Sequence, residues 1–191
     1  MAARKLIVCL ALIVLGSATA QLLSSRAPAP APAGGGKSVY DVAASLPDTT
    51  LFAQLIRVAR ADPTVAQLTD PGFVGVVFAP TNKAFERDSR LIARTLNLAN
   101  GDQILTSPAA AAKLIKVHMI VGQALQLSQL LNDMKLRSAS GEVVEIDTGT
   151  LYGKYISTRR SGNAKFVSTE GDVPAGLALI HRIDRVLVPS S

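Results

Sequence analysis

The sequence VFAPTNKAF at residues 77–85 is the stretch that decides how this chain folds. It closes an apolar run that begins at residue 73, and the run lacks the alternation of a strand with one solvated face. Pro80 ends the run, and a side-chain oxygen of Thr81 or Asn82 can then accept an amide proton at the start of a helix. We therefore expect a strand buried on both faces that passes directly into a helix, with Thr81 and Asn82 as structural residues.

The sequence IHRIDRVLVP at residues 180–189 predicts a closing strand that halts at a proline. His181 has the same parity along this strand as Leu179 and Ile183, so its side chain should point the same way as theirs. We interpret His181 as a packed, hydrogen-bonded structural residue. Asp184 is expected to accept backbone amides beside the strand, which would make it a structural residue as well.

A third stretch, KVHMIVG at residues 116–122, lies between the other two. In this order and at these separations, the three stretches resemble the signature segments of the fasciclin domain, an extracellular adhesion module. The resemblance covers residues 38–189, about the length of one domain. It implies an α+β fold, with a mixed β-wedge or sandwich packed against N-terminal and central helices.

The central histidine stretch supports two interpretations. In the resembled family this stretch has been associated with receptor binding at the cell surface. The resemblance therefore marks His118, Val117, Ile120 and Val121 as candidate partner-binding residues, although this chain has Val117 where the family commonly has Tyr. The residues themselves favour a structural role, because an isolated histidine without partner residues for a metal or a reaction is most often packed and hydrogen-bonded.

The pattern over the rest of the domain predicts helices first and strands afterwards, as in an α+β protein. Apolar residues recur at helical spacing over residues 39–46 and 51–59, and Asp48 or Thr49 is expected to cap the second helix. The pair Ser107-Pro108 is typical of a helix start, with a capping hydroxyl before a proline. This helix should run to about His118.

The C-terminal half has the short runs and turn residues of a sheet. Turns are expected between the strands, including one at residues 171–174, and Gly176 should permit a turn or a close approach of backbones. The strands themselves are expected at residues 135–139, 143–146, 151–158, 164–168 and 177–188.

The N-terminus has the pattern of a secretory signal at residues 1–20. Arg4 and Lys5 precede a continuous apolar run over residues 6–15, which is too short to span a bilayer comfortably. We expect cleavage before Gln21 and a secreted protein of the extracellular space, cell wall or matrix; an uncleaved membrane anchor is the alternative. The only cysteine, Cys9, would leave with the signal.

Residues 21–37 are rich in proline, alanine and glycine and cannot form a packed core. Alternating Pro and Ala favour extended polyproline geometry, and three consecutive glycines add a flexible end. We expect a linker, either a plain spacer or a glycosylated stalk, before a domain at residues 38–189.

The charge balance is mildly basic. Of the 20 Lys and Arg residues, two lie in the predicted signal, so 18 remain against 14 acidic residues, a net charge of +4. Aromatic residues are scarce and tryptophan is absent, so stacking platforms for nucleic acid are not expected. Outside a cell, an extracellular protein or an acidic polysaccharide is the expected partner.

Four basic residues cluster around one predicted hairpin. A docking patch for acidic sugar is one interpretation, and a solvated loop is the other. The four residues are Lys154, Arg159, Arg160 and Lys165.

No residue pattern of a catalytic or metal site is visible in the sequence. The two histidines lack metal-ligand spacing, and no nucleophile motif of the Gly-x-Ser-x-Gly type occurs. We expect no metal, no cofactor and no enzymatic activity. The expected function is non-catalytic adhesion or matrix interaction; a carrier of small apolar ligands, with a pocket between helices and sheet, is the alternative. The sequence leaves the oligomeric state open.

Overall fold

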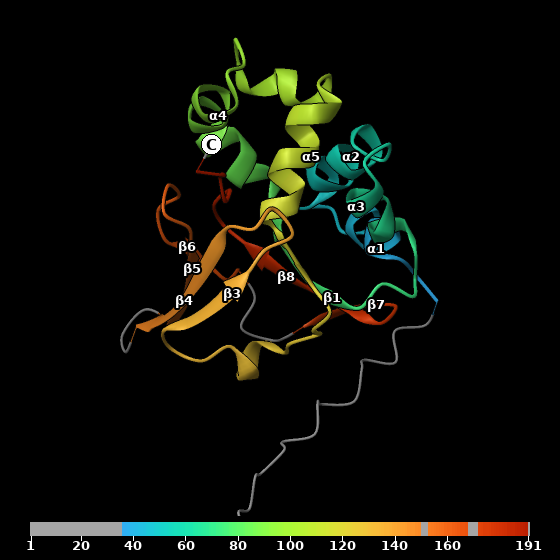
Figure 1. Ribbon diagram of the computed structural model, residues 1–191, viewed down its shortest axis with the longest axis vertical. Helices are drawn as coiled ribbons and strands as arrows, with labels where there is room; N and C mark the ends of the chain where they lie inside the picture. The colour runs from blue at the N-terminus through green and yellow to red at the C-terminus, as the bar shows by residue number, and fades with distance from the viewer. Residues whose placement is uncertain (1–35, 150–152, 168–171, 191) are drawn as a thin grey trace, which may run out of the picture.

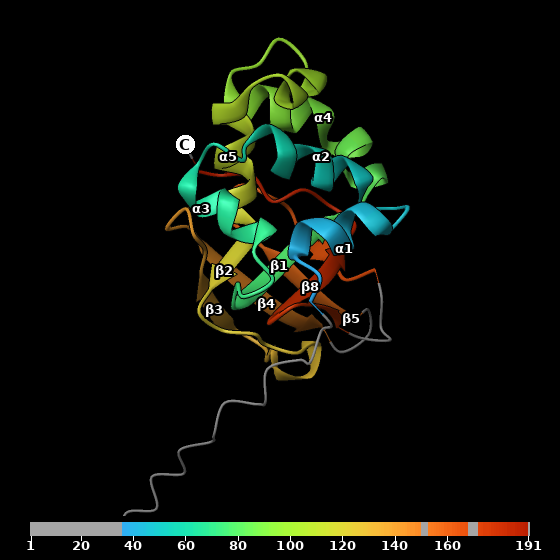
Figure 2. The same cartoon turned by 90° about the vertical axis from the view of Figure 1, so that its right-hand side faces the viewer.

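The structure, a computed structural model, describes residues 36–149, 153–167 and 172–190 (Figure 1). The predicted signal at residues 1–20 lies outside the described residues, as do residues 21–35 of the predicted linker. The α-helices gather at one end of the molecule and the strands at the other, and Figure 2 shows the same division after a quarter turn. The protein is thus an α+β fold, as the sequence predicts.

Five α-helices and three short 3-10 helices are present among the described residues. The α-helices are α1 (Val39–Ser45), α2 (Thr50–Val58), α3 (Pro63–Ala66), α4 (Asn82–Leu96) and α5 (Pro108–Val117). The 3-10 helices are η1 (Gln67–Thr69), η2 (Gly101–Leu105) and η3 (Leu127–Gln129). Side-chain caps set several of the starts: Ser38 and Asp41 form a capping box on α1, and Asp62 caps α3.

The strands that the structure describes form two four-stranded sheets. The first has the order β2-β1-β8-β7, and the second has the order β3-β4-β5-β6. Among the strand pairs of the described residues, only β1–β8 is parallel. The sheets meet where Phe166, just after β6, bridges Ile183 at the end of β8. The strands are β1 (Gly75–Pro80), β2 (Met119–Val121), β3 (Met134–Arg137), β4 (Val143–Gly149), β5 (Gly153–Ser157), β6 (Ala164–Lys165), β7 (Val173–Ala175) and β8 (Ala178–Ile183).

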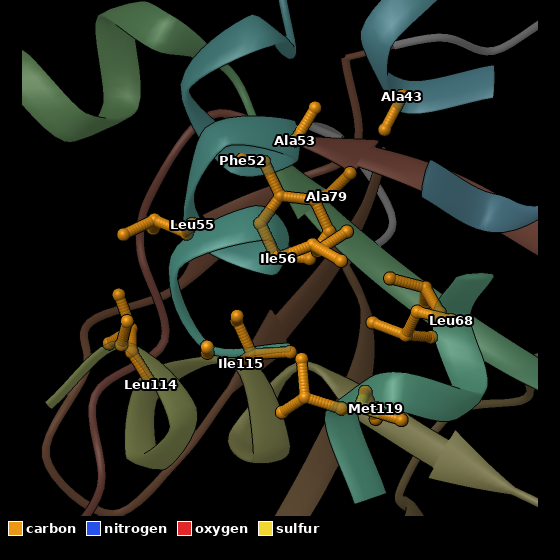
Figure 3. Packing of buried hydrophobic residues seen from close by; sticks show 14 of the residues in the cluster. Ala43, Phe52, Ala53, Leu55, Ile56, Leu68, Ala79, Leu114, Ile115 and Met119 are labelled. Carbon is orange, nitrogen blue, oxygen red and sulfur yellow. The ribbon is translucent and has the colours of Figure 1, made fainter. Parts of the chain in front are cut away.

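Strand β1 separates two hydrophobic cores and is buried along its whole length. Val77 and Ala79 face a core shared with the helices, whereas Val76 and Phe78 face a core between the two sheets. The prediction of a strand buried on both faces is therefore confirmed. Figure 3 shows the helical core, where Phe52 of α2 and Ile115 of α5 lie among the packed side chains.

The structure corrects two sequence predictions about strands. The first concerns the turn expected at residues 171–174, because β7 already begins at Val173. Pro174 is tolerated in this strand because β7 lies at the edge of its sheet and pairs with β8 alone. The closing strand ends at Ile183 rather than at residue 188. Asp184 N–H turns to the carbonyl of Lys165 in β6. Beyond it the amides bond to side chains, since Val186 N–H donates to Asp88 and Leu187 N–H donates to His118.

Two predicted caps are also wrong. The Thr49 hydroxyl donates to the carbonyl of Ala43 (2.8 Å) and makes no cap bond to α2. Asn82 supplies that cap instead, since its Oδ1 accepts from Leu51 N–H at 3.0 Å. Ser107 precedes α5 as expected, but its hydroxyl makes no cap bond, and only Pro108 fits the predicted start.

Gly176, between β7 and β8, occupies a position that no other residue fits. Its φ is +59°, and a Cβ there would lie 2.1 Å from the carbonyl oxygen of Pro71. We expect Gly176→Ala to lower the free energy of unfolding by about 3 kcal/mol, because a left-handed backbone and a backbone clash act together. Urea denaturation measures the change.

Gly141 provides the matched control for this substitution. Its φ is also positive, at +88°, but nothing lies within 4 Å of an added Cβ. Gly141→Ala should therefore cost only about 1 kcal/mol. Equal losses for the two variants would show that the contact with Pro71 is not what restricts Gly176.

Candidate functional site

His118 follows α5 directly and is fully buried. Its Nδ1 lies 2.8 Å from the carbonyl oxygen of Leu114, which can only accept, and its Nε2 lies 3.0 Å from Leu187 N–H, which can only donate. The neutral ring with its proton on Nδ1 satisfies both partners. Burial lowers the pKa of His118 to about 4, against a smaller opposing effect of the Leu114 carbonyl. The ring is therefore a neutral link between α5 and the C-terminal segment.

The other candidate residues of the histidine stretch differ in exposure. Val117 and Ile120 are buried, like His118, and belong to the core between the sheets. Val121 is 47% exposed. In this conformation a partner can contact only Val121 among the four residues that the resemblance marks.

His181 lies in the core between the sheets, 2% exposed, with its ring stacked on Phe78. Its Nε2 is 2.9 Å from the carbonyl oxygen of Leu125, and its Nδ1 is 3.4 Å from a carboxylate oxygen of Asp172. Burial lowers the pKa of His181, with a further lowering from Lys154, while Leu125 and Asp172 act in the opposite direction. His181 thus holds the connection that precedes η3 against the first sheet.

The four basic residues of the predicted patch do not share one surface. Lys154 has the strand parity of buried Ile156, and its ammonium donates to the carbonyls of Leu127 and Leu130, the latter at 2.8 Å. Lys165 pairs in register with Tyr155, so its side chain leaves the opposite face of the sheet. Arg159 and Arg160 are exposed beyond the end of β5. Three cations therefore remain at the surface, and Lys154 supports the fold.

Thr81 and Asn82 connect the start of α4 to the rest of the domain. The Thr81 hydroxyl accepts from Ala84 N–H at 3.3 Å, which confirms its predicted capping role. The Asn82 amide group donates to the carbonyl of Pro47 (3.1 Å) and to the Thr50 hydroxyl (3.0 Å). Asn82 therefore ties α4 to the beginning of α2.

Asp184 accepts a backbone amide, as expected. Its Oδ1 lies 2.6 Å from Lys165 N–H, and its own N–H donates to the carbonyl of Lys165 at 3.0 Å. Arg87 of α4 lies nearby, with its guanidinium 3.8 Å from the carboxylate. The residue thus fastens the end of β8 to β6, where the two sheets meet.

Replacement of Asp184 should weaken this junction. We expect Asp184→Ala to lower the free energy of unfolding by about 1 to 2 kcal/mol, because the Lys165 amide loses a charged acceptor. Asp184→Asn keeps an acceptor oxygen and should retain most of the stability. Thermal unfolding of the two variants measures the difference, and an alanine variant that melts with the parent would contradict this role.

A buried ion pair that the sequence analysis missed joins α4 to the C-terminal segment. Asp88 is 3% exposed, and its two carboxylate oxygens lie 3.0 Å from Nε of Arg185. One of these oxygens also accepts from Val186 N–H at 2.9 Å. The sequence contains an indication of this burial, because Asp88 lies three residues after Phe85 and four before Ile92. This spacing places all three on the inward face of α4.

The α2–α4 groove is an apolar hollow of about 290 Å³ at the helical end of the molecule. Six of its lining residues are apolar, and the ionisable ones are Glu86 and Asp102, both exposed carboxylates. Ser89 and Gly101 complete the lining. The apolar residues are Leu51 and Leu55 of α2, Phe85 and Ile92 of α4, and Ile104 and Leu105 of η2.

Neither a metal cluster nor a membrane span is found in the part of the chain that the structure describes. No three His, Cys, Asp or Glu residues there lie close enough together to hold a metal ion. Across the same residues, no helix has the length and apolar character needed to cross a bilayer.

Comparison with known proteins gives one family and one fold. The family model of the fasciclin domain matches residues 47–189. The structure is similar, with a TM-score of 0.60 and 12% identity, to a solved FAS1 domain pair from the insect cell adhesion molecule fasciclin I. The match covers 80% of this chain and 51% of that one, so this chain spans about half of the solved pair. No curated protein matches the chain.

Proposed function

The chain belongs to the fasciclin domain family, and from this we propose that it is a secreted, non-catalytic module that binds extracellular partners through its surface. Fasciclin domains are associated with cell adhesion and extracellular interactions. The expected signal at residues 1–20 supports secretion. The proposed partner is an extracellular protein or an acidic polysaccharide.

One observation carries the non-catalytic part of the proposal. Five polar side chains of the three signature stretches are used within the fold: His118 and His181 are buried, and Thr81, Asn82 and Asp184 bond to backbone groups. A catalytic residue needs to reach a substrate in a cleft. These groups are already satisfied, so the surface is what a partner can use.

Attachment of coated beads tests this function. Beads that carry the secreted chain should adhere to matrix laid down by the cells that produce it, while beads with albumin should not. Protease treatment of the matrix should abolish attachment if the partner is a protein, and a lyase for acidic polysaccharide should abolish it if the partner is a glycan. Attachment no stronger than that of albumin beads would reject an adhesive function.

Exposed cations provide the contact for an acidic polysaccharide. Arg159, Arg160 and Lys165 remain at the surface after Lys154 is assigned to the fold. The double variant Arg159→Gln and Arg160→Gln should bind heparin beads more weakly and with less dependence on salt. Unchanged elution would assign the glycan contact to another surface.

A second candidate is a carrier of small apolar ligands, which would bind in the α2–α4 groove. This groove is lined by helices alone, whereas the sequence predicts a carrier pocket between helices and sheet. Its mostly apolar lining and its few polar groups have the character of a ligand site. Mass spectrometry of organic extracts from the secreted protein tests this candidate. A stoichiometric apolar compound would support the carrier.

A further inference from the structure

The α2–α4 groove has a size that fits side chains better than a whole small molecule. Its volume of about 290 Å³ is at the lower limit of ligand pockets, which typically hold 300 to 1,000 Å³. Such a hollow can accept one or two anchoring side chains, the arrangement found at the centre of protein interfaces. The groove therefore favours part of a longer chain as its occupant.

The charge at the groove indicates which kind of peptide chain can bind there. Its two ionisable lining residues, Glu86 and Asp102, are both acidic and both exposed, and no basic residue among those described lines it. Without the predicted signal the chain carries a net charge of +4, so the groove differs in sign from the molecule around it. An occupant that places a cation beside its apolar side chain gains from both carboxylates.

The groove is held in shape before any partner arrives. A Cβ on Gly101 would lie 2.7 Å from the Ser89 Cβ, so η2 packs directly onto the backbone of α4. Asn100 caps η2 by accepting from Gln103 N–H at 3.1 Å, and the Gln103 side chain accepts from Ala99 N–H at 2.9 Å. Figure 2 shows α2 alongside α4, the two helices that form the other walls. A preformed site loses less entropy on binding.

We propose that the α2–α4 groove binds a peptide segment of an extracellular partner protein, one in which an aliphatic or aromatic side chain lies next to Lys or Arg. The apolar side chain enters between Leu51, Ile92 and Ile104, and the cation lies against Glu86 and Asp102. This inference rests on the proposed function, since it names the partner chemistry of an interaction module. Val121 and the exposed arginines take no part in it.

Methyl NMR of the full chain with synthetic peptides tests the inference. The probe is the acetylated peptide Gly-Lys-Leu-Phe-Arg-Gly, and its controls are Gly-Glu-Leu-Phe-Glu-Gly and Gly-Lys-Ser-Ser-Arg-Gly. The probe should shift the methyl signals of Leu51, Ile92 and Ile104, and both controls should bind at least tenfold more weakly. Raising the salt concentration should weaken the probe further.

Two charge variants separate the groove from the rest of the surface. The double variant Glu86→Gln and Asp102→Asn should reduce affinity for the probe about tenfold, because both carboxylates are lost. Glu145→Gln with Asp147→Asn removes the same charge from the exposed side chains of β4 and should leave affinity unchanged. All four positions are exposed, so both variants should fold like the parent.

Three outcomes would overturn the inference. The first is the absence of shifts at the groove methyls, and the second is a loss of affinity that is equal for the two double variants. The third is equal binding of the acidic and basic peptides, which would assign the groove to a neutral apolar ligand. The bead assay is independent: continued bead attachment without peptide binding rejects the groove and keeps the proposed function, and the reverse result rejects the function alone.

Discussion

Replacing Asp88 by alanine is expected to lower the free energy of unfolding by about 3 to 5 kcal/mol. The carboxylate is 3% exposed and receives three hydrogen bonds from Arg185 and Val186 through Nε and the backbone amide. Removing one partner of a buried ion pair leaves the other charge and an amide without compensation. Because Arg185 is partly exposed, the lower end of this range is expected.

Urea denaturation of Asp88→Ala, with Asp147→Ala as the control, measures this effect. Asp147 lies exposed on β4, and its loss should change the free energy of unfolding by less than about 0.5 kcal/mol. Asp88→Asn keeps an acceptor for Val186 N–H and should fall between the two. A loss below about 1 kcal/mol for Asp88→Ala would contradict the role of this ion pair in joining α4 to the C-terminal segment.

Acid should destabilise the protein through His118. Its pKa is lowered from 6.5 to about 4 in the folded state, so the unfolded chain takes up the proton first as the pH falls. The stability linked to this ring is thus complete above pH 6.5 and is lost as the pH falls toward 4, by about 3 kcal/mol in total. His181, whose pKa is also lowered, acts in the same direction.

The variant His118→Gln isolates this contribution. It removes the titrating ring and leaves His181 and every carboxylate in place, so the difference between its stability profile and that of the parent reports His118 alone. We expect the variant to be less stable than the parent at pH 7 and to lose the difference as the pH falls to 4. A difference that stays constant from pH 7 to pH 4 would show that the folded protein does not hold His118 neutral.

The features predicted correctly from the sequence depend on residues close together in the chain. The cap of Thr81 on α4 and the turn at Gly176 belong to this class. The burial of β1 on both faces was also readable, because apolar residues without alternation need two covering layers. The order of helices and strands could also be predicted, because it depends on the local pattern of apolar and turn residues.

Features that join distant segments were missed. The cap of α2 comes from Asn82, 31 residues beyond the amide that it binds, and Asp88 bonds a guanidinium 97 residues away. Their partners follow from the tertiary packing of α4, which no local pattern describes. The surface patch predicted for Lys154 is wrong, because this residue has the same strand parity as buried Ile156. No sequence pattern indicates that its ammonium donates to the carbonyls of Leu127 and Leu130.

We expect His118 to stabilise the fold and partners to bind the exposed surface. The variant His118→Gln in the bead assay tests this expectation most directly. Parent and variant are coupled at equal density, and attachment to matrix is compared at pH 7.4 and at a temperature where both remain folded. Equal attachment with a lower melting temperature is the predicted result, because the ring is buried and serves the fold. Loss of attachment with an unchanged melting temperature would contradict it and make the imidazole itself the binding group.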